Sequence, residues 1–255
     1  VSSKRITYKN GDVCDYEILK RSMKDSDYVV HCAASKHLPL CEKNPDSAIK
    51  VNVEGTRNVL TASAFWGVKK TLLLSTDKAV NPTCVMGATK LLAERLFLEF
   101  SSMIPASIVR LGNVFASNGS VVPTFQDKIK HNLPITVNDE RAERYFITKK
   151  DIGMFIVDRL HDMTTGEIFI KKMKVIRIKD LAECMTPAGY PIKYGNMLDG
   201  EKLTERLFSD DEAYRIKDNG DYVIINGQRN KVKYVLQDPE ICTRSEITQM
   251  LKEIK

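Results

Sequence analysis

One short stretch of the sequence places hydroxyl, carboxyl and ammonium side chains directly after an apolar run. Residues 72–74 are three leucines, Thr76, Asp77 and Lys78 follow them, and Lys90 comes further along. Neighbouring carboxyl and amine groups can give and take protons, as general acid–base chemistry requires. Any one of these residues alone would be more simply a polar strand end or a solvated lysine. Their convergence at one edge of a fold favours a reactive site.

The elements that would position these residues alternate along the first two thirds of the chain. Apolar runs predict strands at 27–33, 69–75 and 106–111. Helical periodicity precedes or separates these runs at 16–24, 44–66 and 87–102. Such alternation is typical of a parallel sheet covered on both faces. Because ligands bind at the carboxyl edge of such sheets, we expect the polar residues that follow the second run to face a ligand.

The alternation weakens after Leu111. Residues 113–145 contain Gly119, Pro123 and Pro134 between short apolar pieces, which is typical of loops that build a pocket. A further helix is predicted at 151–163, and a strand with its connection at 166–178. We therefore expect a second lobe that is interleaved with the sheet domain.

Composition narrows the class of protein. The 255 residues are 43% hydrophobic and 28% charged, which is globular composition and excludes collagen, coiled coils and disordered chains. A net charge of +6 suits an anionic ligand such as a nucleotide, and no basic run interleaved with aromatic residues indicates a nucleic-acid partner. No membrane segment or signal peptide is predicted. Six cysteines without metal-ligand spacing indicate no metal site and a reducing, cytoplasmic location.

Several blocks in a fixed order carry a family resemblance. The pattern Ser-Thr-Asp-Lys-Ala-x-Asn-Pro, followed by Met-Gly-Ala-x-Lys, runs from Ser75 to Lys90, and Gly11-Asp12-Val13, residues 33–39 and residues 200–203 accompany it. These blocks resemble the extended short-chain dehydrogenase/reductases, and specifically the UDP-N-acetylglucosamine 4,6-dehydratases of polysaccharide biosynthesis. Met86 resembles a subgroup with Met in place of the usual tyrosine. The resemblance covers nearly the whole chain.

The resemblance implies a reaction in three steps with NAD or NADP. Hydride leaves sugar C4, water is eliminated across C5 and C6, and hydride returns to C6, which gives a UDP-4-keto-6-deoxy sugar for polysaccharide or glycan biosynthesis. Lys78 resembles the base for the C5 proton and Asp77 the acid for the departing hydroxyl. Thr76 resembles the partner of the C4 oxygen, Met86 shapes the nicotinamide side of the pocket, and Lys90 grips the nicotinamide ribose.

Further binding residues carry over from the same blocks. The residues that resemble cofactor ligands are Asp12, Val13, Cys32, Lys36, Leu74, Ser75, Lys90 and Val114. The residues that resemble UDP-sugar ligands are Lys36, Asn113, Ser120, Val121, Val122, Thr136, Arg144 and Glu201. For Cys32 and Leu74 a plain strand-core role fits equally well.

The fold implied is α/β, a Rossmann-like doubly wound parallel sheet with a small interleaved C-terminal substrate-binding lobe. The dinucleotide-binding domain is predicted at 1–112, with 146–165 returning to it, and the lobe and C-terminal tail at 113–145 and 166–255. The chain has no GxGxxG turn, and residues 4–8 correspond to the third strand of the family. We therefore expect a sheet that lacks its first two β-α units and exposes an edge.

Two alternative functions stay open. A nucleotide-sugar epimerase would use the same hydride abstraction without elimination, although the adjacent Asp77 and Lys78 favour a dehydratase. A non-catalytic nucleotide-sugar or NAD(P)-binding module is favoured by the missing phosphate turn and by Leu198, where the family usually has arginine. In each case the expected partner is a UDP-sugar, and we expect a homo-oligomer.

Overall fold

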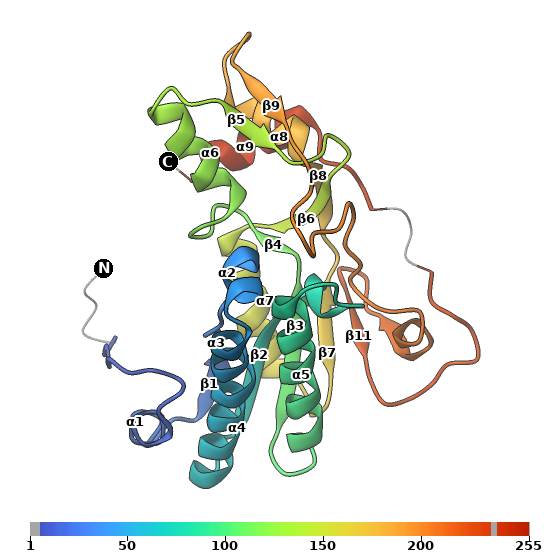
Figure 1. The fold of residues 1–255 in the computed structure, drawn as a ribbon. Helices are drawn as coiled ribbons and strands as arrows, with labels where there is room; N and C mark the ends of the chain where they lie inside the picture. The colour runs from blue at the N-terminus through green and yellow to red at the C-terminus, as the bar shows by residue number, and fades with distance from the viewer. Residues whose placement is uncertain (1–5, 236–238, 255) are drawn as a thin grey trace.

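The computed structural model describes residues 6–235 and 239–254 and has one main sheet of six strands (Figure 1). Its order is β1-β2-β3-β7-β11-β10. The strands are β1 (Tyr28–His31), β2 (Lys70–Thr76), β3 (Ala106–Leu111), β7 (Ile168–Lys171), β10 (Ile216–Asp218) and β11 (Tyr222–Ile225). The first four of the row pair in parallel, and β11 and β10 are antiparallel additions. The predicted α/β fold with a mostly parallel sheet is confirmed.

Both faces of the sheet are buried, which explains why its central strands are mostly apolar. Leu73 and Ile108 pack with Phe97 under helices α4 (Gly55–Trp66) and α5 (Val85–Phe100). Their neighbours on the two strands are Leu72, which precedes Leu73, and Val109, which follows Ile108. These two side chains pack under helix α7 (Lys149–Asp162) on the opposite face (Figure 1). Successive side chains of a strand point to opposite faces, so each strand contributes to both cores.

The predicted helix at 44–66 is divided into three pieces. Helix α3 (Pro45–Ile49) is followed by a π-helical turn (Lys50–Glu54) and then by α4, which ends at Gly67 in the left-handed conformation (φ +62°). Within the π turn, the buried side chain of Asn52 accepts a hydrogen bond from Ser35 N (2.8 Å) and donates one to Ser35 O (3.0 Å). The irregular turn therefore holds the loop that follows β1.

A second lobe lies beyond the carboxyl ends of β2 and β3 (Figure 1). It contains the sheet β4-β6-β8 and the pair β5-β9. These strands are β4 (Asn113–Val114), β5 (Ile135–Val137), β6 (Glu143–Ile147), β8 (Lys174–Arg177) and β9 (Ile192–Tyr194), and the helices are α6 (Val121–Lys130), α8 (Ile178–Met185) and α9 (Arg244–Lys252). Phe115, Phe146, Ile176 and Ile247 form its core.

The prediction that residues 166–255 belong to the substrate-binding lobe is wrong for three strands of the main sheet. β7 pairs in parallel with β3, β11 pairs with β7, and β10 pairs with β11, so all three belong to the main sheet. The physical reason is that β7 presents Ile168 and Ile170 to one core and Phe169 to the other, as a central strand must. The lobe receives the remaining segments around β8, β9 and α9.

The amino-terminal part approaches the sheet without joining it. Of the strand expected at 4–8, residues 4 and 5 lie outside the described residues, and residues 6–8 form no strand. Residues 6–8 pair with no neighbour in the described chain, and β1 forms the sheet edge, paired with β2 alone. Helix α1 (Tyr16–Ser22) then packs on α4, and helix α2 (Leu38–Lys43) precedes α3. In the described residues no helix combines the length and apolarity needed to cross a membrane.

Candidate active site

Two adjoining cavities lie at the carboxyl ends of β2 and β3, between the sheet and the lobe. The larger has a volume of about 440 Å³ and the smaller about 270 Å³. Both are lined by Leu38, Lys78, Asn113, Ser120 and Glu201. Lys78 therefore lies at their border. Among the described residues there is no group of three His, Cys, Asp or Glu side chains that could hold a metal ion.

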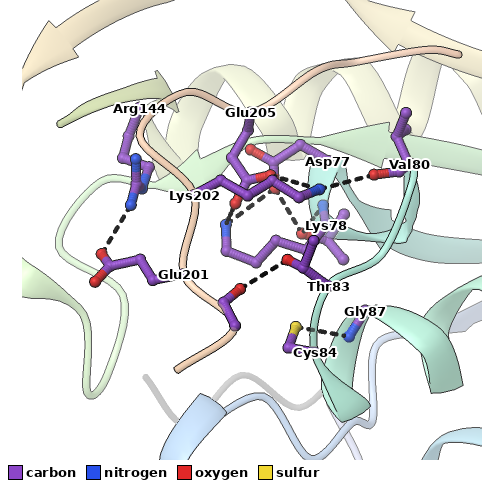
Figure 2. A network of polar contacts seen from close by, with 12 residues as sticks. Asp77, Lys78, Val80, Thr83, Cys84, Gly87, Arg144, Glu201, Lys202 and Glu205 are labelled. Carbon is purple, nitrogen blue, oxygen red and sulfur yellow. Dashed lines mark hydrogen bonds and ion pairs between the residues drawn. The ribbon is translucent and has the colours of Figure 1, made fainter. Parts of the chain in front are cut away.

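Thr76, Asp77 and Lys78 form one hydrogen-bonded unit where β2 ends. Asp77 begins a 3-10 turn (Asp77–Ala79), and its Oδ1 atom accepts hydrogen bonds from Thr76 Oγ1 (2.9 Å) and Lys78 Nζ (3.1 Å). Figure 2 shows the Asp77–Lys78 pair within a larger polar network. The Asp77 side chain is completely buried and lines neither cavity. Asp77 therefore meets the cavities only through Thr76 and Lys78.

Lys90 and Ser75 provide buried polar groups in the larger cavity. Lys90 Nζ donates a hydrogen bond to Leu74 O (2.7 Å), and burial lowers the pKa of Lys90 to about 8. Ser75 Oγ is buried without a hydrogen-bond partner in the described chain. Met86 lines the same cavity with an apolar side chain. An unpartnered hydroxyl and a buried amine beside an apolar wall fit the polar end of a nicotinamide nucleotide.

The lowered pKa of Lys90 predicts a stability cost that depends on pH. Below about pH 8 the folded protein holds a buried ammonium, whereas the unfolded chain keeps that proton in water up to its ordinary pKa of 10.5. The unfolded state binds the extra proton between these values, so this cost to the free energy of unfolding is relieved as pH rises from about 8 to 10.5. Lys90→Met carries no charge and should lack this relief.

We expect the stability advantage of Lys90→Met over the wild type to shrink by about 3 kcal/mol across that pH window. Urea unfolding of both proteins at a series of pH values measures the difference. If the difference in the free energy of unfolding between the two proteins stays constant from neutral pH to pH 10.5, the pKa of Lys90 is not lowered by burial.

The predicted cofactor residues fall into two groups. Lys36, Leu74, Ser75, Lys90 and Val114 line the larger cavity with Thr76 and Met86. Asp12, Val13 and Cys32 line a separate cavity of about 370 Å³. His31 also lines this separate cavity. Its burial lowers the pKa of the imidazole to about 3, and the nearby charge of Lys90 contributes to that shift. The ring is therefore neutral where it hydrogen-bonds to Thr56 Oγ1 (3.0 Å).

Most of the predicted sugar residues meet at the smaller cavity. It is lined by Asn113, Ser120, Val121, Thr136, Arg144 and Glu201. Arg144 donates a hydrogen bond to Glu201 Oε1 (2.7 Å), so these two predicted ligands pair with each other. The side chain of Val122 gives no support to its predicted role as a sugar ligand, because it is completely buried in the lobe core with Phe115 and lines neither cavity. Val121 and Val122 are adjacent on α6, so they face different directions.

The segment at 198–205 contributes residues that sequence reasoning missed. Thr83 Oγ1 donates a hydrogen bond to Gly200 O (2.9 Å), and a Cβ at Gly200 would lie 2.6 Å from Cys84 Cβ, so the close contact requires glycine (φ +78°). Beyond this contact, Glu205 turns toward Lys78, and Lys202 pairs with Glu205 (3.4 Å) (Figure 2). Glu205 lines the smaller cavity. In sequence it stands in a polar run typical of a solvated surface, so only its closeness to the Gly200 block could have indicated it.

Comparison with known proteins places this site in a family. A sequence profile described as "Polysaccharide biosynthesis protein" matches residues 2–227. The chain belongs to the polysaccharide biosynthesis protein family. Its membership of the extended short-chain dehydrogenase/reductases, predicted from the 75–90 pattern, is confirmed.

Relatives of this chain include proteins that are named as a dehydratase and as an epimerase. The UDP-N-acetylglucosamine 4,6-dehydratase (inverting) of Campylobacter jejuni is 39% identical over 91% of this chain and 70% of its own length. A UDP-glucose 4-epimerase of Rickettsia bellii is 34% identical over 87% of this chain and 67% of its own length. The crystal structure of Pen from Bacillus thuringiensis has a TM-score of 0.90 at 33% identity, and covers 98% of this chain and 82% of Pen.

Proposed function

We propose that this polysaccharide biosynthesis protein is a UDP-N-acetylglucosamine 4,6-dehydratase that forms a UDP-4-keto-6-deoxy sugar. The observation that carries the proposal is the place of Lys78, at the border between a cavity with Ser75 and Lys90 and a cavity with Arg144. An amine at this border can reach a sugar that lies between a cofactor in the larger cavity and the sugar's own UDP group in the smaller cavity. The dehydratase named among the relatives supports this substrate.

The larger cavity would hold the nicotinamide end of NAD or NADP. When bound, this cofactor would accept hydride from sugar C4 and supply it to C6. Ser75 Oγ and Lys90 Nζ are the buried polar groups that would hold it, and Thr76 Oγ1 would hydrogen-bond the C4 oxygen. Met86 carries a thioether, which cannot take the C4 hydroxyl proton, so this proton would pass to Asp77 through the Thr76 hydroxyl or to a water held by Thr76.

Elimination assigns separate tasks to Lys78 and Asp77. Lys78 takes the C5 proton, the electrons of that bond form the C5–C6 double bond, and the C6 hydroxyl leaves as water after it gains a proton. Asp77 contacts no cavity, so its proton would reach the substrate through the hydroxyl of Thr76, to which it is hydrogen-bonded (2.9 Å). In this scheme Asp77 is an indirect acid.

An epimerase is the second candidate, because a UDP-glucose 4-epimerase is also a relative. Epimerisation at C4 needs no base for C5, so the Lys78–Asp77 pair (3.1 Å) favours dehydration. The test is to incubate the protein with UDP-N-acetylglucosamine and either NAD or NADP and to weigh the product by mass spectrometry after chromatography. A dehydratase gives a product lighter by one water, an epimerase gives an isomer of equal mass, and a binding module gives neither.

Two further features stay predictions. We propose a UDP-sugar as the partner of the smaller cavity, supported by Arg144 at its wall. The homo-oligomeric state and the cytoplasmic location predicted from the sequence are proposals that size-exclusion chromatography with light scattering and cell fractionation can test.

A further inference from the structure

Glu205 is a buried carboxylate that faces Lys78 from outside the β2 turn. Its side chain is only 2% exposed. Its Oε1 atom lies 3.6 Å from Lys78 Nζ, and its Oε2 atom lies 3.4 Å from Lys202 Nζ (Figure 2). Oε2 makes no hydrogen bond within the described chain. A buried carboxylate in contact with two amines is expected to be held by them, because an isolated buried charge is costly.

The chain on both sides of Glu205 is anchored to the sheet domain. Before it, Lys202 Nζ donates a hydrogen bond to Val80 O (3.0 Å), next to the turn that carries Lys78. After it, the buried Arg110 of β3 donates a hydrogen bond to Leu207 O (2.9 Å). These anchors fix the backbone of Glu205 relative to β2 and β3. The short distance to Lys78 is thus a property of the packed fold.

Lys78 has a carboxylate on each side, and the two differ in their access to the cavities. Asp77 Oδ1 is 3.1 Å from Lys78 Nζ but lines no cavity, whereas Glu205 lines the smaller cavity together with Lys78. A base gains positive charge as it takes a proton. A fixed carboxylate beside it stabilises that charge more in the transition state than in the ground state, which accelerates the step.

We propose that Glu205 is a positioning residue for elimination, which holds Lys78 Nζ at the border of the two cavities and stabilises the charge that Lys78 gains from the C5 proton. This inference rests on the proposed dehydratase function. Glu205 does not line the larger cavity, where Thr76, Met86 and Lys90 lie, so it should not affect oxidation at C4.

The first test compares Glu205→Gln with the wild type in single turnovers with UDP-N-acetylglucosamine. Elimination should slow by about 10²-fold, the typical cost of a misplaced catalytic group. Oxidation at C4, followed by the absorbance of the reduced cofactor, should keep its rate, so reduced cofactor should accumulate. In steady state kcat should fall without a rise in KM. Glu205→Asp keeps the charge and should recover part of the loss.

The second test needs no turnover. A lysine-selective acylating reagent is applied to the protein without substrate, and the labelling rate of the Lys78 peptide is measured by mass spectrometry. Glu205→Gln should label faster at Lys78, because one of the two carboxylates that hold this amine is lost. Glu246→Gln is the control, since Glu246 also pairs with a lysine, Lys174 (2.7 Å), but lines neither cavity and does not contact the anchors of Glu205. It should leave both Lys78 labelling and elimination unchanged.

The outcomes separate the two claims. If the wild type dehydrates the sugar and Glu205→Gln does so at the same rate, the role of Glu205 is wrong. A parallel loss of C4 oxidation and elimination would also overturn it, because that pattern indicates a general structural defect. If the wild type gives no dehydrated product, the proposed function fails instead, and unchanged labelling of Lys78 in Glu205→Gln would still reject the contact.

Discussion

Lys78→Met is expected to slow formation of the UDP-4-keto-6-deoxy product by about 10²–10⁴-fold, the usual contribution of a positioned acid or base. Methionine keeps an unbranched chain but offers only a thioether, which cannot take the C5 proton. The rate is measured by chromatography of the nucleotide sugars. Oxidation at C4 should persist, because Thr76, Ser75 and Lys90 are unchanged.

A matched control for this variant is Lys69→Met. Lys69 lies just before the opposite end of β2, where it forms an exposed ion pair with Asp27 (2.8 Å). Exposed pairs contribute little, about 0–1 kcal/mol, so this variant should keep both its stability and its activity. Wild-type product formation by Lys78→Met would show that the base is another residue.

Arg110→Met is expected to lower the free energy of unfolding by about 3–5 kcal/mol, as happens when one partner of a buried ion pair is removed. Arg110 is 1% exposed and forms two double hydrogen bonds, with Glu94 (3.0 and 2.6 Å) and with Glu212 (both 2.9 Å). The variant leaves both carboxylates buried without their cation. Urea denaturation at neutral pH measures the loss.

The source of this loss can be tested by removing the carboxylates as well. The triple variant Arg110→Met, Glu94→Gln, Glu212→Gln should recover part of the stability, because no uncompensated charge stays buried. A loss below about 1 kcal/mol in Arg110→Met would contradict the buried network and would fit a solvated pair. Loss of the Leu207 contact should also loosen the segment that carries Glu205.

The local part of the fold and site was predictable from the sequence. The apolar runs at 69–75 and 106–111 match β2 and β3 within one residue, since strands buried on both faces need such runs. The 75–90 pattern located Thr76, Lys78 and Lys90 on the larger cavity, because Thr76 and Lys78 lie where one strand ends and Lys90 lies in the next helix. The hydrophobic pattern of a segment predicts its structure where residues close in sequence determine how its side chains are buried.

Contacts between distant segments account for what sequence reasoning missed. The assignment of β7 to the main sheet depends on its register with β3, in which Ile168 pairs with Ile108, and no local pattern encodes that pairing. Glu205 resembles a surface residue until the 198–205 segment folds over Lys78. Likewise, one position along α6 separates Val121, which lines the cavity, from Val122 in the core, and helix periodicity alone does not fix which faces inward.

The most direct test of the proposed dehydration is to trace where the hydrogen on C4 of the sugar goes. UDP-N-acetylglucosamine that carries deuterium at C4 is converted by the protein, and the position of the label in the product is read by NMR. Dehydration in this site predicts deuterium on C6 of a 4-keto-6-deoxy sugar, since the hydrogen that leaves C4 returns to C6. Deuterium found again on C4 of an epimeric sugar would contradict the dehydratase and identify an epimerase.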